Sequence, residues 1–428
     1  MLAAAIAPVN ADPLNSKEKN RAIESIGTLL TENYVFPDVA EKMRSHIQSE
    51  LKSGRYSTLK DTNAFASKLT EDLQSISKDK HLRIFHAPER IADQRKRDDE
   101  PKSDDIPPQV LQQAKRENFG FSEVKIIEGN IGYLKLNKFF DASIAGDTAV
   151  AAMNFFANAE ALIIDLRRNG GGSPSMIQLL TSYLYPSEPV HLNNFYWRPT
   201  DTHTQTWTLP HVPGIRRPDM PVYVLTSNRT FSAAEEFSYN LRNLERATLI
   251  GETTGGGAHP GGSQIVDDQF MIWLPEGRAI NPITNTNWEG VGVKPHIESS
   301  EQDALGIAHE TALLALAKEN PGEGGQLFRW YLESLEAENN PVTLEAETLA
   351  AYVGTYGPRQ LSFVDGELYY QRKGRNKLKL SALSHTKFAV ETLPGFRLEV
   401  VMKKGEAIAL RALYDNGRVN ENPRSKKI

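Results

Sequence analysis

The chain has 428 residues, 39% of them hydrophobic, with 49 basic and 54 acidic side chains and a net charge of −5. This length leaves room for two or three domains with a large core, and the near balance of charge argues against nucleic acid or an anionic membrane as the main partner. The absence of cysteine excludes disulfides, a thiol nucleophile and cysteine-based zinc sites.

Residues 1–12 are mostly small and apolar, and Val9-Asn10-Ala11 is typical of the small-residue end of a secretory signal peptide. The basic start of such a signal is missing, so we expect either a signal-peptide remnant or a disordered tail. A signal would direct the protein to the bacterial periplasm or outside the cell. No later stretch reaches the ~20 apolar residues that a membrane span needs, so no span is expected.

Residues 13–78 are predicted to form an N-terminal helical domain. Their apolar residues recur at steps of three and four, which indicates amphipathic helices, and Pro37 and Gly54 mark breaks between them. The pattern then changes to the alternation of a short strand, and His81 stands at its start.

Residues 79–318 are predicted to form an α/β domain. The segment 88–105 is dense in charged residues, which predicts a solvated excursion. Two alternating runs within 119–136 surround a Glu-Gly-Asn turn and predict a hairpin. A strand, a loop and a helix then follow one another twice, over 161–185 and 221–244. This order predicts parallel strands with crossover helices, and ligands bind such sheets beyond the carboxyl ends of the strands.

The last part of the chain is predicted to be separate. Residues 319–342 begin with a linker rich in glycine and continue as a helix. Residues 343–428 consist of short alternating segments, with the hairpin turn signal Asp365-Gly366 between two of them. This pattern predicts a small antiparallel β domain, and it contains no residue set with evident chemistry.

The chemistry is predicted where the buried strand 222–225 runs through a turn into a helix that starts at Ser232. A hydroxyl there is held at the exposed end of a sheet, and the free N–H groups of the helix start can take up the negative charge of a tetrahedral intermediate. Ser232-Ala-Ala-Glu235 is also a capping box, which contributes about 1 kcal/mol to a helix without any catalysis. The local sequence alone favours the cap.

Two further loops are rich in glycine. Asn169-Gly170-Gly171-Gly172 follows a buried strand, and its glycines allow backbone N–H groups to point into a cleft at little steric cost. A phosphate site is the competing interpretation, but the loop lacks the spacing and the lysine of a Walker motif and the pattern of a dinucleotide fingerprint. The second loop, residues 251–262, contains His259.

Taken together, four stretches resemble the tail-specific, or C-terminal processing, serine peptidase family, in particular the branch of interphotoreceptor retinoid-binding protein and the tricorn core protease. They lie in family order at residues 119–134, 165–172, 226–236 and 251–255. The resemblance covers about residues 15–318 and implies a crotonase-like ββα core. Residues 343–428 are similar to the small β domain appended to bacterial hydrolases of the β-lactamase type.

The resemblance implies roles for several of these residues. It makes Ser232 the nucleophile and supplies an oxyanion hole from the N–H of Ala233 and that of Gly170 or Gly171, at about 3 kcal/mol for each donor. The processing branch takes its general base from a lysine that follows the serine in sequence. Glycines occupy that place here, at 255–257, so a Ser–Lys dyad is not expected.

In the tricorn-like arrangement, a histidine ahead of the sheet is the base and a glutamate near the end of the domain orients it. His81 and Glu289 match those places, so the implied triad is Ser232, His81 and Glu289. The imidazole would take the serine proton and return it to the leaving amine, while the carboxylate fixes the tautomer. His259 is the alternative base. The resemblance implies neither a metal nor a cofactor.

The sequence therefore predicts a serine peptidase that acts on peptides or unfolded protein. The charged segment between His81 and Phe119 is too short for the PDZ domain with which the family holds its substrates. Two alternatives stay open: a non-catalytic protein of the same fold that binds a hydrophobic ligand, with Ser232 as a helix cap, and an esterase or amidase for small molecules. Self-association is also left open.

Overall fold

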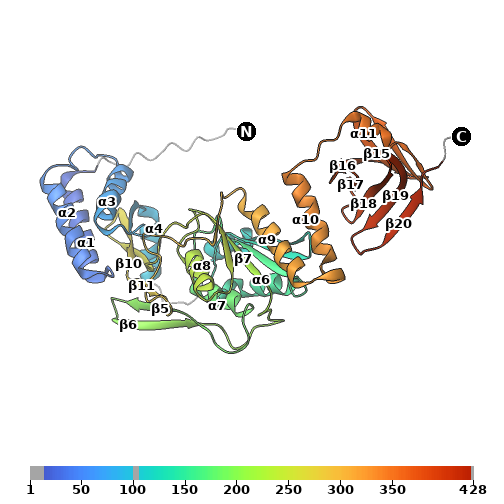
Figure 1. Cartoon of the computed structure of the whole chain (residues 1–428). Helices are drawn as coiled ribbons and strands as arrows, with labels where there is room; N and C mark the ends of the chain where they lie inside the picture. Colours follow the sequence, from blue (N-terminus) through green and yellow to red (C-terminus); the bar gives the residue numbers. More distant parts are fainter. Residues whose placement is uncertain (1–13, 100–105, 426–428) are drawn as a thin grey trace, which may run out of the picture. The chain divides into compact units, whose positions relative to one another are not determined.

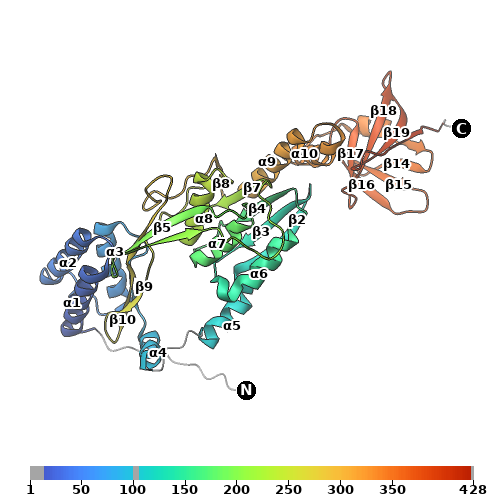
Figure 2. The same ribbon diagram turned by 90° about the horizontal axis from the view of Figure 1, so that it is seen from below.

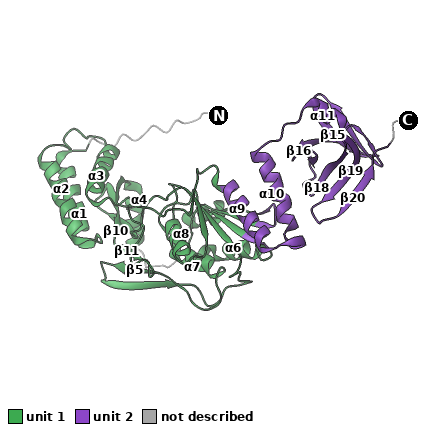
Figure 3. Ribbon diagram, in the orientation of Figure 1, with its two compact units in different colours: residues 1–125, 132–158, 162–304 green, residues 126–131, 159–161, 305–428 purple. Residues whose placement is uncertain are grey.

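The computed structural model describes residues 14–99 and 106–425 (Figure 1). The predicted signal remnant or tail, residues 1–12, lies outside the described residues, as do residues 100–105 of the charged excursion. The chain divides into two compact units: residues 1–125, 132–158 and 162–304 form unit 1, and residues 126–131, 159–161 and 305–428 form unit 2 (Figure 3). The domain bounds expected from the sequence stay predictions.

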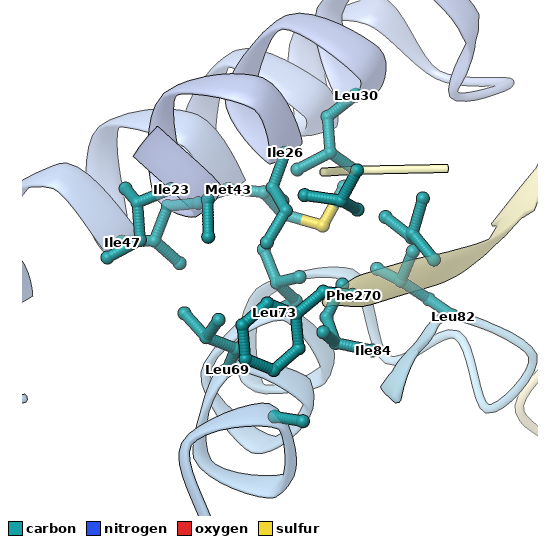
Figure 4. Packing of buried hydrophobic residues seen from close by; sticks show 14 of the residues in the cluster. Ile23, Ile26, Leu30, Met43, Ile47, Leu69, Leu73, Leu82, Ile84 and Phe270 are labelled. Atoms are coloured by element: carbon teal, nitrogen blue, oxygen red, sulfur yellow. The ribbon is translucent and has the colours of Figure 1, made fainter. Parts of the chain in front are cut away.

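The predicted helical bundle is present at the start of unit 1. It consists of α1 (Ser16–Asn33), α2 (Pro37–Lys52) and α3 (Thr62–Ser77). Asn15 and Glu18 form a capping box at the start of α1, and Pro37 occupies the first position of α2, where its missing N–H costs nothing. The buried apolar faces of the three helices include Ile23, Ile26, Leu30, Met43, Ile47, Leu69 and Leu73 (Figure 4).

The bundle shares its core with a small antiparallel sheet. The sheet contains β1 (Arg83–His86), β10 (Phe270–Pro275) and β9 (Gly261–Ile265), in the order β1-β10-β9. Ile84 and Phe270 carry the apolar core from the helices into these strands (Figure 4), and full burial of one such side chain contributes about 1.5–3 kcal/mol. This packing fixes the position of His81, which lies two residues before the start of β1.

The central sheet of unit 1 has six strands in the order β12-β8-β7-β4-β3-β2 (Figure 2). Their bounds are β2 Phe121–Ile127, β3 Ile131–Leu136, β4 Ala161–Asp165, β7 Val222–Thr226, β8 Thr248–Gly251 and β12 Ile297–Glu298. The helices of this part are α6 (Ala142–Phe155), α7 (Pro174–Ser182) and α8 (Ala233–Asn243). Because β4 and β7 are parallel neighbours, the loops that follow them lie at the same edge of the sheet. The predicted hairpin and the two predicted strand–loop–helix units are confirmed.

Some elements of unit 1 were not expected. The strands β5 (His191–Trp197) and β6 (Thr202–Trp207) form a sheet with β11 (Gly277–Ile280). The charged segment contains the helix α4 (Pro88–Asp99), which the sequence interpretation did not include. Its Ile91 is buried and its Arg95 pairs with Asp268 at 2.7 Å, while most of its described side chains are exposed, in line with a solvated segment. Further helices are α5 (Pro108–Arg116) and the short 3-10 turn η1 (Asn118–Gly120).

Unit 2 contains the predicted antiparallel β domain and is all helix and antiparallel strand. Its helices are α9 (Ala304–Glu319), η2 (Gly322–Gly325), α10 (Gln326–Asn339) and α11 (Ala346–Ala351). Its strands follow one another in chain order as β13 Gly354–Tyr356, β14 Arg359–Val364, β15 Glu367–Arg372, β16 Lys377–Ala382, β17 Lys387–Val390, β18 Phe396–Lys403, β19 Glu406–Tyr414 and β20 Val419–Pro423. A bridge between Tyr356 and Arg424 joins the two ends of this sheet, so it approaches a closed barrel.

The β domain of unit 2 is packed against α10 through one buried cation. The Arg397 guanidinium lies 3.9 Å from the centre of the Trp330 ring and donates to Glu333 at 2.5 Å. Both contacts compensate for the burial of its charge.

In the part of the chain that the structure describes, no helix combines the length and the apolar character required to cross a bilayer.

Candidate active site

Ser232 stands between the end of β7 and the first residue of α8, with φ 55° and ψ −123°. A residue with a side chain rarely adopts this conformation, which costs about 1–3 kcal/mol. The neighbouring glycine loop makes room for it, because a Cβ on Gly171 would lie 2.7 Å from the Ser232 Cβ. A residue that only caps a helix normally has extended backbone, so capping does not account for the strain at Ser232.

Glu235 ties the start of α8 to the glycine-rich loop 251–262. Its buried carboxylate accepts hydrogen bonds from four donors, which are Ser232 N–H at 2.9 Å, Thr254 Oγ1 at 2.5 Å, Gly256 N–H at 2.6 Å and Gly257 N–H at 2.8 Å. Burial raises the pKa of Glu235, and the hydrogen bonds act in the opposite direction. The predicted capping box is present. Three of the four donors to the Glu235 carboxylate belong to the loop 251–262, which is therefore held beside Ser232.

The loop 169–172 is held by the buried side chain of Asn169. The Asn169 amide donates to Leu136 O at 2.9 Å, and its oxygen accepts the Gly171 N–H at 2.9 Å. The Gly171 N–H therefore already donates a hydrogen bond within the protein and is not free to donate one to a ligand. Gly172 lines the same cavity as Ser232 and Ala233, whereas Gly170 lies outside the lining of that cavity.

A cavity of about 390 Å³ lies in front of Ser232 and brings the predicted nucleophile and base together. Ser232 and Ala233 reach it from α8, His81 from the segment before β1, and Gly172 from the glycine loop. Most of the remaining wall is apolar and includes Pro174, Phe195, Trp197, Trp273, Ala279 and Trp288. The unexpected strand β5 supplies Phe195 and Trp197, so the sequence interpretation missed part of this wall.

His81 is held in this cavity by packing. Its side chain is 10% exposed, and its ring lies 4.6 Å from the centre of the Phe231 ring. The Nδ1 atom is 4.0 Å from Asp79 Oδ1 and has no hydrogen-bond partner among the described residues. Burial lowers the pKa of His81 to about 4. The imidazole is therefore neutral at neutral pH, which is the state a general base needs.

Asp79 is a fully buried acid that the sequence interpretation missed. It accepts hydrogen bonds from the His81 backbone N–H at 3.0 Å and from the Tyr34 hydroxyl at 3.3 Å. The His259 Nδ1 lies 2.8 Å from Asp79 Oδ2, the oxygen that also accepts the Tyr34 hydroxyl. In the sequence, Asp79 stands between two lysines and resembles a solvated charge. Only its spacing of two from His81 could have drawn attention to it.

Glu289 belongs to the same buried cluster. It accepts the Ala258 N–H at 2.5 Å and lies 3.5 Å from His259 Nδ1, while its Oε1 has no hydrogen-bond partner among the described residues. Burial and the nearby Asp79 raise the pKa of Glu289 to about 7. Asp79, His81 and Glu289 each place one side-chain atom within 4.8 Å of the others. Such atoms can also bind a metal ion.

His259, the alternative base, lies on the other side of this cluster. It lines a different cavity of about 570 Å³, together with Tyr34, Phe36, Arg278 and Glu289, and is not among the residues that line the cavity of Ser232. Its ring packs against Phe36 at 5.3 Å. Of the two predicted histidines, His81 is the one that shares a cavity with the serine.

A third cavity, of about 740 Å³, adjoins the cavity of Ser232 at His81 and Trp273, which line both. Three cationic side chains lie around it, Lys80, Arg83 and Arg90. The side chains of His81 and Trp273 therefore border a cavity on each side.

Two family models match the chain. Peptidase family S41 matches residues 130–299, and the N-terminal domain of peptidase S41 in eukaryotic IRBP matches residues 15–120. The first match contains Ser232 and Glu289, and the second contains His81.

Several solved structures are similar to the chain. One is described as a peptidase from Parabacteroides merdae, with 18% identity and a TM-score of 0.47 over 71% of this chain and 98% of that chain. A lipoprotein from Streptococcus agalactiae has 15% identity and a TM-score of 0.46 over 73% and 99%. The photosystem II D1 C-terminal processing protease has 14% identity and a TM-score of 0.40 over 68% and 94%.

Proposed function

Because the chain belongs to peptidase family S41 and is a serine peptidase of that family, we propose that it cleaves peptide bonds with Ser232 as the nucleophile and His81 as the general base. The observation that carries this assignment is the shared cavity: a serine in a strained backbone conformation and a neutral, buried imidazole face the same space. A helix cap needs neither feature.

The first half-reaction follows from this geometry. His81 takes the proton of the Ser232 hydroxyl while its oxygen attacks the carbonyl carbon of the substrate. The N–H groups of Ala233 and Gly172 serve as donors to the resulting oxyanion, because both residues line the cavity while the Gly171 N–H is occupied. Each such donor contributes about 3 kcal/mol to the transition state.

The imidazolium formed in that step needs a negative partner. Asp79 and Glu289 are the carboxylates of its cluster, and we assign them the role of orienting and stabilising the ring. The 4.0 Å separation between His81 Nδ1 and Asp79 Oδ1 is longer than a hydrogen bond, as is common for catalytic groups before the substrate binds. His81 then returns the proton to the leaving amine, and water releases the acyl group by the reverse steps.

We further propose peptides or unfolded protein as substrates. The cavities on both sides of His81 leave room for an extended chain. No observation favours a small ester or amide over a peptide. The aromatic wall of the cavity is compatible with a bound apolar ligand, but it gives no reason for the strain at Ser232.

The test combines labelling and turnover. Wild type, Ser232→Ala and the exposed-serine control Ser53→Ala are incubated with a fluorophosphonate probe and then with a mixed peptide library that is read by mass spectrometry, after circular dichroism has shown equal folding. We expect wild type and Ser53→Ala to be labelled and to cut peptides, and Ser232→Ala to do neither. Labelling without peptide cleavage would point to an esterase or amidase, and the absence of both would reject Ser232 as a nucleophile.

A further inference from the structure

Glu236 stands four residues after Ser232, one turn further along α8. Side chains at this spacing lie on the same face of a helix, and four residues advance the axis by about 6 Å. Both residues accordingly line the same cavity. Glu236 is only 4% exposed, so it forms a deep part of the wall rather than the rim.

The carboxylate of Glu236 is incompletely partnered. Its Oε1 is buried and makes no close hydrogen bond among the described residues, and the side chains of Asn193 and Asn240 lie near enough to lower its pKa by hydrogen bonding. A buried carboxylate oxygen without a partner costs free energy. Burial also raises the pKa of Glu236, to about 7. Glu236 is thus a buried carboxylate in the wall of the cavity that contains the nucleophile, with the Asn193 and Asn240 amides as its neighbours.

The rest of the cavity is suited to a hydrocarbon chain. Its wall includes the aromatic rings of Phe195, Trp197, Trp273 and Trp288. Among the residues that line it, all of them described, Glu236 is the single carboxylate. An apolar wall that ends at a carboxylate matches a side chain with an apolar stem and a cationic head, as in lysine and arginine.

We propose that Glu236 determines specificity by binding the lysine or arginine side chain that precedes the scissile bond. The assignment rests on the proposed function, because it takes Ser232 as the nucleophile. With the acyl carbon at Ser232, the preceding side chain extends along α8 and places its cationic group at the Glu236 carboxylate, one helical turn away. The salt bridge adds a cationic partner to the Glu236 carboxylate, and aromatic walls cover the methylene groups.

The substrate test uses fluorogenic peptides that differ only in the residue before the scissile bond, with lysine, arginine, norleucine or glutamate at that position. We expect wild type to cleave the lysine and arginine peptides about 10- to 100-fold better, by kcat/KM, than the norleucine peptide, since a hydrogen bond to a charged group accounts for that factor. In Glu236→Gln the ratio of the two kcat/KM values should fall to about one. Glu245→Gln, which removes a charge just after the C-terminal end of α8, should keep the wild-type ratio.

Two results of this test overturn the proposal while leaving the proposed function intact. One is cleavage by wild type without a preference for the cationic peptides, and the other is an unchanged preference in Glu236→Gln. Both require active protein, so they are distinct from a failure of Ser232 as the nucleophile.

A binding measurement decides the case without catalysis. Pentylammonium and 1-pentanol are titrated into wild type, Glu236→Gln and Glu245→Gln by calorimetry, since the two ligands share the stem and differ in the charged head. The proposal is supported if wild type and Glu245→Gln bind pentylammonium at least about tenfold more tightly than 1-pentanol. Binding of pentylammonium should be lost in Glu236→Gln. Equal binding of the two ligands, or binding that Glu236→Gln retains, overturns the proposal.

Discussion

The two halves of the candidate active site are built differently. The nucleophile side, which we define as Ser232, Glu235 and the loop 169–172, is held by backbone contacts: the Glu235 carboxylate accepts four hydrogen bonds, and the loop packs directly against Ser232. The base side, which we define as Asp79, His81, His259 and Glu289, leaves His81 Nδ1 and Glu289 Oε1 without hydrogen-bond partners among the described residues.

This difference corresponds to what each side does. The nucleophile must be in place before the substrate arrives, and the hydrogen bonds to Glu235 that hold it are already formed. The base side gains a positive charge only when His81 takes the serine proton. Until then, two buried carboxylates face each other near a neutral ring, and this repulsion contributes to the raised pKa of Glu289. Formation of the imidazolium relieves the repulsion, which favours the charged state of the reaction.

The largest expected effect comes from His81→Ala, which removes the base. We expect kcat/KM for a peptide substrate to fall by about 10⁴-fold or more, as loss of a base does in serine peptidases. His259→Ala is the matched variant, since His259 contacts the same Asp79 but lines another cavity, and a smaller loss is expected. If His259→Ala were the more damaging of the two, the base would have to be reassigned.

Glu289→Gln tests the charge on the base side. Glu289 must be ionised to stabilise the imidazolium, and its pKa is about 7, so kcat/KM of wild type should fall as the pH drops through about 7. His81, with a pKa of about 4, is still neutral there and does not cause this fall. In the variant, kcat/KM at its maximum should be lower than in wild type by about 10²- to 10⁴-fold. The fall of kcat/KM near pH 7 should be absent.

The pH profile of kcat/KM, measured from pH 4 to 9 on both proteins, checks this. If kcat/KM of Glu289→Gln still falls near pH 7, the group that titrates there is not Glu289. A second readout has a defined sign: the raised pKa means that the folded state binds this proton more tightly than the unfolded state does. Ionised Glu289 therefore lowers the stability of wild type as the pH rises through about 7, and this loss should be absent in the variant.

The nucleophile side could be predicted from the sequence because its information is local. An apolar strand, a short turn and the Ser-x-x-Glu pattern lie within residues 221–244, and the glycine loop directly follows another apolar strand. The parallel neighbours β4 and β7 then bring both loops to one edge of the sheet. The helical bundle and the antiparallel β domain were predictable for the same reason, since period and turn signals lie within each element.

The base side depends on contacts that the sequence does not display. Asp79 and His259 are 180 residues apart and meet only through the packing of the folded chain. His81 and Glu289 were placed by resemblance, and no local pattern marked their partners. The aromatic wall was missed because His191–Trp197 does not alternate cleanly, and β5 becomes a strand by pairing both with β6, its neighbour in the chain, and with β11, which lies far along the chain.

Glu235→Gln tests whether the nucleophile side is the more tightly built. Each carboxylate oxygen accepts two hydrogen bonds, and an amide would turn an NH₂ group towards one of these donor pairs. We expect a loss of about 2–4 kcal/mol in the free energy of unfolding, measured by urea denaturation. Glu245→Gln, at an exposed position beyond the same helix, should stay within about 0.5 kcal/mol of wild type. Equal stability of the two variants would mean that the hydrogen bonds of Glu235 contribute little to folding.

The smallest expected effect, and the finest test of the base side, comes from Gly257→Ala. An added Cβ would lie 2.8 Å from His81 Cε1 and would also overlap the Phe231 ring, so both rings must shift. The obstacles are atoms of packed rings, so we expect a loss of about 1–3 kcal/mol in the free energy of unfolding, and kcat/KM should fall by about 10- to 100-fold because a displaced base loses its alignment. Gly262→Ala is the matched control, because no atom lies within 4 Å of its Cβ position. If both variants kept wild-type activity, His81 would not need its present position for catalysis. A loss of activity shared equally by both would instead indicate a general sensitivity of the loop.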